Sequence, residues 1–265
     1  LTVDLTPEGP RLGGTAAYAG LTAHMLGLRV GIVTSWGGEL PLGPMAALPI
    51  INLAAEKSTT FENISTPEGR LQFIFNVAHR LDLNLIPDLW LNAPIVHLGP
   101  VAQEVEPTLV RHFSSALIGV TAQGWLRSWG ADGRVMVAEW PEANFVLRQT
   151  GAAVISSEDV GEDEARIEEL ATSCRVLAVT EQAEGVRVYW NGDVRRFRPP
   201  DVIEVDSTGA GDIFAAAFFF RLYATRDPWE AARFASQLSA ISVTRPGLYG
   251  VPTQEEIRDC LAEVL

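Results

Sequence analysis

Short apolar runs that alternate with helical segments constrain the fold of this chain more than any other feature. The runs are bounded by Gly, Pro or polar residues and cover residues 30–33, 94–98, 116–120, 152–155 and 176–179. Such runs are typical of parallel strands that are buried on both faces of a sheet. Between several of them, the apolar spacing predicts helices at residues 15–26, 106–113 and 162–171. The alternation therefore predicts an α/β fold, doubly wound, with a central, mainly parallel sheet flanked by helices.

Two segments show the alternation that is typical of β-hairpins. Residues 58–80 alternate around a turn signal at residues 67–69, which predicts a small hairpin outside the main sheet. Residues 186–198 are divided by Asn191-Gly192, a dipeptide that favours tight hairpin turns. We expect this second hairpin at the edge of the core sheet.

The carboxyl-terminal part is predicted to be mostly helical. Residues 202–205 are predicted as a strand, and helices are predicted at residues 213–223 and 229–243. Between these helices, Asp227 is a suitable N-cap and Pro228 a suitable first helical residue.

Composition limits the partners of the chain. Its 265 residues are 47% hydrophobic, which suits one domain over residues 1–265 with a sizeable core. The formal net charge of −13 would repel nucleic acid and an anionic membrane surface, so we expect neither as a partner. A phosphorylated nucleotide is still compatible, because helix N-termini supply a local positive field.

Cysteine usage and apolar run length indicate a reducing, cytoplasmic compartment. Cys174 and Cys260 are far apart and form no zinc or disulfide pattern, and no apolar run is long enough to span a bilayer. The chain opens at Leu1 without an initiator Met or a basic n-region. We therefore expect no signal peptide, and we expect part of a first strand to be missing.

The segment Asp206-Ser207-Thr208-Gly209-Ala210-Gly211-Asp212 carries the strongest chemical signal. It lies between a predicted strand and an apolar helix, so its glycines lie at a helix N-terminus. Backbone N–H groups there can receive a phosphate, and the helix dipole favours negative charge. The backbone of Gly209, Ala210 and Gly211 is thus a candidate anion hole. Asp212 is a candidate general base for a substrate hydroxyl.

A purely architectural interpretation of this segment is also open. The glycines could form a tight turn, and Asp212 could cap the helix that it begins. A P-loop is excluded as the phosphate site, because the chain contains no Gly-x-x-x-x-Gly-Lys-Ser/Thr segment.

The chain resembles the ribokinase-like, or PfkB, carbohydrate kinases. DSTGAGDIF resembles the second signature of that family, and residues 12–19, followed by 26–27 and 30–33, resemble the first. Further matches fall in family order at Thr180, Gly185, 233–236 and 243–247. The resemblance implies Asp212 as the base and Gly209 to Gly211 as the anion hole, in agreement with the interpretation of the residues themselves.

The resemblance also implies a substrate site near the amino terminus. Asp4 occupies the position of an acidic residue that binds substrate hydroxyls, and the backbone of Gly13-Gly14 approaches the same substrate. Tyr18 replaces the usual Asn and could stack on a sugar or cyclitol ring or pack into the core. This pattern is similar to inositol-kinase-like branches. Asp4 could instead be a solvated residue in a frayed terminus, and the glycines a simple turn.

Nucleotide contacts are implied at Thr180, Gly185 and Ser236. Gln182 replaces a frequent Gly in the loop between the first two, which alters the expected backbone geometry. Ser236 falls at the adenine-facing helix position, although a Ser on an amphipathic helix is otherwise unremarkable.

Metal sites are implied by two acidic segments. Glu158 and Asp159 correspond to the region that organises Mg²⁺ and phosphate through water, or they belong to a helix N-cap. Asp206 and Thr208 match positions that line a monovalent-cation site, such as one for K⁺, in some relatives.

The sequence thus predicts a kinase that uses ATP and Mg²⁺ to phosphorylate a hydroxyl of a sugar, cyclitol or nucleoside. Residues 58–80 would form the main part of a β lid, whose exposed edge would allow a homodimer. Two alternatives remain open: a non-catalytic sugar- or nucleotide-binding regulator with the same fold, and a vitamin-precursor kinase.

Overall fold

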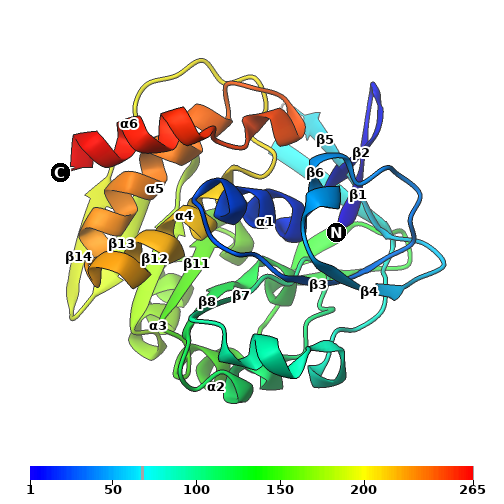
Figure 1. Ribbon diagram of the computed structural model, residues 1–265, viewed down its shortest axis with the longest axis horizontal. Helices are drawn as coiled ribbons and strands as arrows, with labels where there is room; N and C mark the ends of the chain where they lie inside the picture. The colour runs from blue at the N-terminus through cyan, green and yellow to red at the C-terminus, as the bar shows by residue number, and fades with distance from the viewer. Residues whose placement is uncertain (67–68, 265) are drawn as a thin grey trace.

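A six-stranded sheet with the order β14-β13-β12-β11-β8-β7 forms the centre of the molecule (Figure 1). The computed structural model describes residues 1–66 and 69–264. The strands are β7 (Ile95–Leu98), β8 (Leu117–Thr121), β11 (Ala152–Ser156), β12 (Val176–Thr180), β13 (Val186–Trp190) and β14 (Asp193–Phe197). The first four are mutually parallel, and β13 and β14 are antiparallel additions. The predicted α/β fold with a mainly parallel sheet is confirmed.

Helices cover both faces of this sheet, which explains why its strands are apolar throughout. On β11, Ala153 and Ile155 belong to the core cluster that includes residues of α2 and α3. Ala152 and Val154, which alternate with them, belong to the cluster built with α4 and α5. Figure 1 shows α1, α4, α5 and α6 on one side of the sheet and α2 and α3 on the other.

The helix α4 is hydrophobic on all sides because it contacts the sheet, α1 and α5. The helices are α1 (Thr15–Met25), α2 (Ala143–Leu147), α3 (Glu164–Ser173), α4 (Ala210–Thr225), α5 (Pro228–Ser242) and α6 (Gln254–Val264). The predicted cap between α4 and α5 is confirmed, since the Asp227 side chain accepts the N–H groups of Trp229 and Glu230. Among the described residues, no helix is long and apolar enough to cross a membrane.

A second sheet lies beside the core and has the order β2-β1-β5-β6. Its strands are β1 (Thr2–Thr6), β2 (Gly9–Gly13), β5 (Thr59–Thr66) and β6 (Gly69–Asn76). β5 and β6 pair antiparallel as predicted, while the turn predicted at residues 67–69 falls largely outside the described residues. β1 pairs in parallel with β5 and antiparallel with β2, so the amino terminus supplies half of this sheet. A small hairpin of β9 (Arg127–Trp129) and β10 (Val135–Val137) contacts β6.

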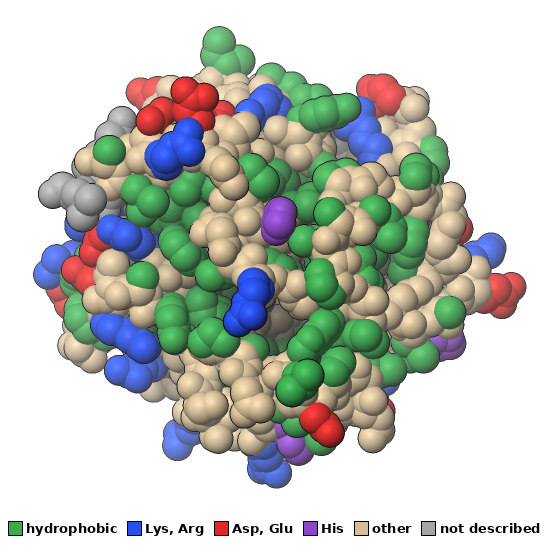
Figure 2. Space-filling model, in the orientation of Figure 1, with side chains coloured by type: hydrophobic (Ala, Val, Ile, Leu, Met, Phe, Trp, Pro, Cys, Tyr) green, Lys and Arg blue, Asp and Glu red, His purple; other side chains and the backbone are tan. Residues whose placement is uncertain are grey.

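The run predicted at residues 30–33 forms a strand outside the central sheet. It becomes β3 (Ile32–Trp36), which pairs in parallel with β4 (Ile50–Ala54) in a separate sheet. A cavity of about 660 Å³ is lined by α1, β3 and β7, and one end reaches Thr15 and Glu104. In the orientation of Figure 1, Figure 2 shows a hollow near the middle of the molecule's face, rimmed largely by hydrophobic side chains.

Two local predictions were wrong. Residues 202–205 form no strand: Val202, Ile203 and Val205 are exposed, and the Val205 N–H donates to the carbonyl of Val243 instead of a strand neighbour. The helix predicted at residues 106–113 is a 3₁₀ segment, Pro107–His112. Local apolar content could not reveal that residues 202–205 have no neighbouring strand edge.

The second hairpin is confirmed at the edge of the core sheet. Asn191 and Gly192 have φ values of 52° and 78°, as a tight turn with two left-handed residues requires.

Gly119 on β8 provides a test of core packing. A Cβ added to Gly119 would lie 2.4 Å from the Phe219 ring of α4, so Gly119→Ala forces the helix away from the sheet. We expect a loss of about 1–3 kcal/mol in the free energy of unfolding, measured by urea denaturation. Val194→Ala on the exposed edge strand β14 is the control and should change the free energy by less than about 0.5 kcal/mol. Equal stability of the Gly119→Ala and wild-type proteins would contradict this packing.

Candidate active site

The candidate site lies where the carboxyl ends of the central parallel strands meet the amino terminus of α4. In doubly wound sheets this edge is the usual ligand site, because loops from several strands converge there. Ser156 ends β11 and pairs with Thr180 at the end of β12. Asp212 lies in the first turn of α4. The fold therefore brings residues from both halves of the chain to one edge.

Asp212 is held by a hydrogen bond from α1. The Thr15 hydroxyl donates to Asp212 Oδ1 at 2.6 Å, across 197 positions of sequence. Burial raises the pKa of Asp212 to about 6, the Thr15 hydrogen bond opposes this shift, and the negative charge of Asp4 adds to it. A carboxylate with this pKa is ionised near neutral pH and is a better proton acceptor than an ordinary Asp.

The turn before α4 has the geometry of an anion site. Gly209 has φ of +81°, and a Cβ there would lie 2.2 Å from the ring of Tyr18. The i→i−4 hydrogen bonds of α4 begin with the Ile213 N–H, which donates to the Gly209 carbonyl. The N–H groups of Gly211 and Asp212 therefore belong to the first turn, where the helix itself supplies no acceptor. A Cβ on Gly211 would meet no atom within 4 Å, so the space on the side-chain face of this residue is open. The Ala210 N–H donates to the Ser207 carbonyl, so it is directed into the turn itself.

Asp4 and the glycines of residues 13–14 are in direct contact. A Cβ on Gly13 would lie 2.0 Å from Asp4 Oδ2, so only glycine leaves room for this carboxylate. The Thr2 hydroxyl donates to Asp4 Oδ1 at 3.0 Å. Gly14, with φ of +82°, precedes α1 as its N-cap. Burial raises the pKa of the Tyr18 phenol, and the negative charges of Asp4, Asp206 and Asp212 add to this shift.

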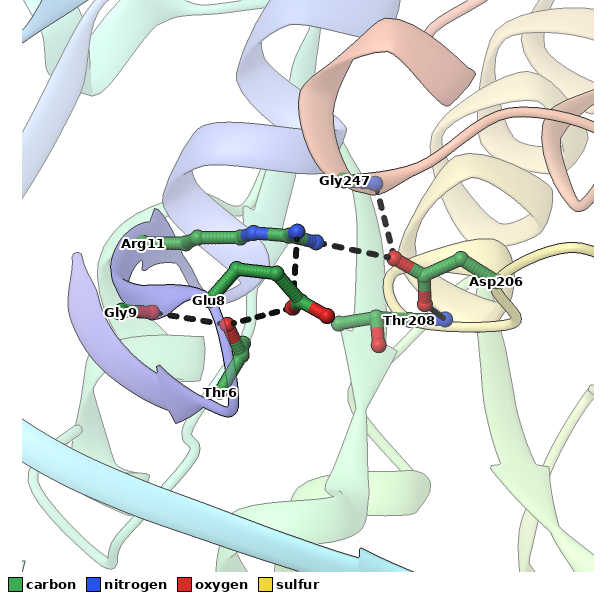
Figure 3. A network of polar contacts seen from close by, with 7 residues as sticks. All are labelled: Thr6, Glu8, Gly9, Arg11, Asp206, Thr208 and Gly247. Atoms are coloured by element: carbon green, nitrogen blue, oxygen red, sulfur yellow. Dashed lines mark hydrogen bonds and ion pairs between the residues drawn. The ribbon is translucent and has the colours of Figure 1, made fainter.

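Asp206 joins the anion turn to the second sheet (Figure 3). Its carboxylate accepts the N–H groups of Thr208 and Gly247, each at 2.9 Å. The Arg11 guanidinium of β2 approaches Asp206 Oδ2 at 3.8 Å and also pairs with Glu8. These hydrogen bonds outweigh burial and lower the pKa of Asp206. Both Asp206 oxygens thus have hydrogen-bond partners, and the monovalent-cation site at Asp206 and Thr208 stays a prediction.

Residues 156–159 form a capping box at the end of β11. The Ser156 hydroxyl accepts the Glu158 N–H, and Asp159 Oδ2 accepts the Ser156 N–H at 2.9 Å. Asp159 is buried, and Gln123 Nε2 donates to its Oδ1 at 3.2 Å. Glu158 is exposed and accepts a hydrogen bond from Gln182. In the described part of the chain, no group of three or more His, Cys, Asp or Glu side chains could hold a metal ion.

The predicted nucleotide loop follows β12 directly. The Thr180 hydroxyl donates to the Ile155 carbonyl at 3.3 Å. A Cβ on Gly185, which has φ of +96°, would lie 2.1 Å from the carbonyl oxygen of Phe197. Gln182 has φ of 51°, so the position where a Gly was expected does adopt left-handed backbone. Ser236 on α5 is only 5% exposed, and its predicted nucleotide contact stays a prediction.

Comparison with known proteins identifies carbohydrate kinases as similar proteins. The model of the pfkB family carbohydrate kinases matches residues 132–254. Probable fructokinase-4 of Arabidopsis thaliana is 25% identical, and the match covers 95% of this chain and 83% of that protein. Inositol 3-kinase of Zea mays is 32% identical over 58% of this chain and 39% of its own length. The chain is thus similar to the PfkB carbohydrate kinases.

Solved structures agree on the fold of this kinase. A pyrophosphate-dependent kinase of the ribokinase family, complexed with a pyrophosphate analog and myo-inositol, superposes with a TM-score of 0.81. It is 17% identical, with 97% of this chain and 96% of that chain covered. The chain therefore has a ribokinase-like fold. Its similarity to carbohydrate kinases identifies it as a phosphotransferase with an alcohol group as acceptor.

Sequence reasoning missed two residues that contact the candidate carboxylates: Thr15 and Gln123. Thr15 follows the Gly13-Gly14 pair directly, so its place in that motif was a usable signal. Gln123 follows β8 by two residues. Its position just after the carboxyl end of a parallel strand could have drawn attention to it.

The acid limb of the pH profile tests the environment of Asp212. A base must be ionised to accept a proton, so kcat/KM should fall about tenfold per pH unit below a pKa of about 6. Thr15→Val removes the hydrogen bond that opposes this raised pKa, so the limb should move to higher pH. Thr22→Val, which removes a hydroxyl that donates to the Tyr18 carbonyl on the same helix, is the control. A decline of kcat/KM that begins only near pH 4, or one that Thr15→Val does not move, would contradict the raised pKa of Asp212.

Proposed function

We propose that this kinase transfers the terminal phosphoryl group of ATP to a hydroxyl of a sugar or cyclitol, with Asp212 as general base. Its relatives include kinases of sugars, nucleosides and inositol. The observation that carries the proposal is the position of Asp212. Thr15 holds this carboxylate in the first turn of α4, next to Gly211, whose side-chain face is open.

The base acts on the attacking hydroxyl, and the anion site acts on the phosphoryl group that is transferred. Asp212 takes the proton of the attacking hydroxyl, and its Thr15 hydrogen bond keeps the other carboxylate oxygen oriented. The amides of the first α4 turn receive the negative charge of the phosphoryl oxygens as they approach. The helix dipole adds to this stabilisation without a cationic side chain.

The acceptor binds beside Asp4. This carboxylate is oriented by Thr2 and passes over Gly13, so it can accept hydrogen bonds from two hydroxyls of a polyol. Tyr18 limits the same acceptor site, because its buried ring packs against Gly209 of the turn before α4. A larger or more mobile residue at position 18 would shift the anion turn relative to the acceptor. The close contact of Tyr18 and Gly209 thus couples acceptor binding to phosphoryl binding.

The donor binds across the loops after β11 and β12. Thr180 and Gly185 lie in the second loop, whose residue Gln182 is hydrogen-bonded to Glu158 in the first. Mg²⁺ is commonly held by one or two carboxylates together with substrate phosphates, and the exposed Glu158 and adjacent Asp159 fit that donor set through water. When bound, the metal neutralises phosphate charge.

The sheet β2-β1-β5-β6 serves as a lid over the acceptor. It carries Asp4 and is linked to the core through Arg11 and Asp206. Lid closure would exclude water, which otherwise competes for the phosphoryl group. Leu5, Ile64 and Phe75 are exposed on its strands, which favours a homodimer through the lid.

Turnover measurements test this function. Purified protein is assayed with a panel of sugars, cyclitols and nucleosides, each with ATP or pyrophosphate as donor. We expect ATP-dependent product formation that Asp212→Asn lowers by at least about 10³-fold, since base and orientation are lost together. Asp259→Asn, an exposed site on α6, is the matched control and should leave turnover unchanged.

Two results would contradict the proposal. Tight polyol binding without turnover on either donor would identify a binding protein instead of a kinase. Full activity of Asp212→Asn would remove Asp212 from the chemistry.

A further inference from the structure

Arg11 lies on the lid, directly opposite Asp4. In the antiparallel pair of β1 and β2, Asp4 is the cross-strand partner of Arg11. The side chains of two such partners leave a sheet on the same face, with their Cβ atoms about 4.5–5.5 Å apart. The arginine and the candidate acceptor residue therefore share one face of the lid.

Two contacts orient the Arg11 guanidinium (Figure 3). Its Nη2 pairs with Glu8 Oε2 at 3.2 Å, within the lid. Its Nη1 lies 3.8 Å from Asp206 Oδ2, which belongs to the core. Glu8 lies in the turn between β1 and β2, and the Thr6 hydroxyl donates to its Oε2 at 3.1 Å. The hairpin of β1 and β2 thus directs the guanidinium toward the turn before α4.

Asp206 is a well-anchored partner for this guanidinium. Its Oδ1 accepts the Thr208 N–H and its Oδ2 accepts the Gly247 N–H, each at 2.9 Å. Its own N–H donates to the Val243 carbonyl at 3.1 Å. Three backbone groups therefore hold Asp206 just before the turn that precedes α4. A shift of Arg11 relative to Asp206 is consequently a shift of the lid relative to this turn.

The ion pair joins the two parts of the site that phosphoryl transfer must align. In the proposed reaction, Asp4 binds the acceptor from the lid, and Asp212 takes the proton of the acceptor hydroxyl from the core. A misplacement of about 1 Å between reacting groups can lower a rate about 10²-fold. The Arg11 side chain is 39% exposed, and ion pairs this accessible to water contribute little to stability. We therefore expect the pair to act on alignment more than on stability.

We propose that Arg11 is a positioning residue whose ion pair with Asp206 holds the acceptor-binding face of the lid in place over the turn before α4. This inference rests on the proposed function and adds to it a residue that acts without touching the substrate. Arg11 remains protonated throughout and exchanges no proton.

The kinetic test uses the full chain with ATP and whichever of fructose, myo-inositol and cytidine the wild-type protein phosphorylates fastest. Arg11→Gln should lower kcat/KM for the acceptor about 10²-fold and leave KM for ATP unchanged. Arg11→Lys keeps the charge and should retain more activity than Arg11→Gln. In an Asp206→Asn background, Arg11→Gln should have almost no further effect, because the partner of Arg11 is already lost.

Amide hydrogen exchange without substrates supplies a readout that does not depend on activity. Strand β2 contacts the 3₁₀ segment Gly247–Gly250 of the core. Arg11→Gln should speed exchange in both segments and leave exchange in α4 unchanged, since only the attachment of the lid is weakened. The melting temperature should fall by less than about 3 °C. If Asp206→Asn is inactive by itself, this exchange measurement decides the question.

Arg80→Gln is the matched control. It removes an exposed arginine whose ion pair with Glu106, at 2.6 Å, involves neither the lid nor the turn before α4. This variant should leave kcat, both KM values and the exchange of β2 unchanged.

Wild-type acceptor kinetics in Arg11→Gln would overturn the role of Arg11. Effects of Arg11→Gln and Asp206→Asn that multiply in the double variant, or unchanged exchange in β2, would also overturn it, because Arg11 would then act without Asp206. Each of these results leaves the proposed function intact as long as Asp212→Asn is inactive. Failure of the wild-type protein to turn over any acceptor would instead overturn the proposed function itself.

Discussion

The hydrogen bond from Thr15 to Asp212 is the interaction on which the rest of the site depends. It joins the first turn of α1 to the first turn of α4 and orients the candidate base. Its geometry requires Gly99, where a Cβ would lie 2.4 Å from the Thr15 methyl group. The site is rigid because its chemistry is supported by close backbone approaches to the sheet.

Electrostatic balance in the site differs from that of the whole protein. The chain carries a formal net charge of −13, yet Arg11 lies beside the carboxylate of Asp206 just before α4. The amides at the start of α4 add local positive potential there.

Much of the fold was predictable because local patterns and tertiary contacts agree. The four parallel strands, the Asn191-Gly192 hairpin and the cap at Asp227 were all identified from short segments. Residues 202–205 were not, because their apolar side chains remain exposed and no strand edge is available to them. The separation of β3 from the central sheet likewise depends on strand order, which local patterns do not contain.

The sequence by itself determined the glycine turn before α4, because Gly209 and Gly211 before an apolar helix favour such a turn and place Asp212 in the first turn of the helix. It also indicated Asp4 and Gly13 as one site, which the contact between them supports. Only the tertiary structure decided that Thr15 and Gln123 contact the candidate carboxylates, and that Ser236 is buried. Such contacts join residues far apart in the chain, and they arise only when sheet order brings the strand ends together.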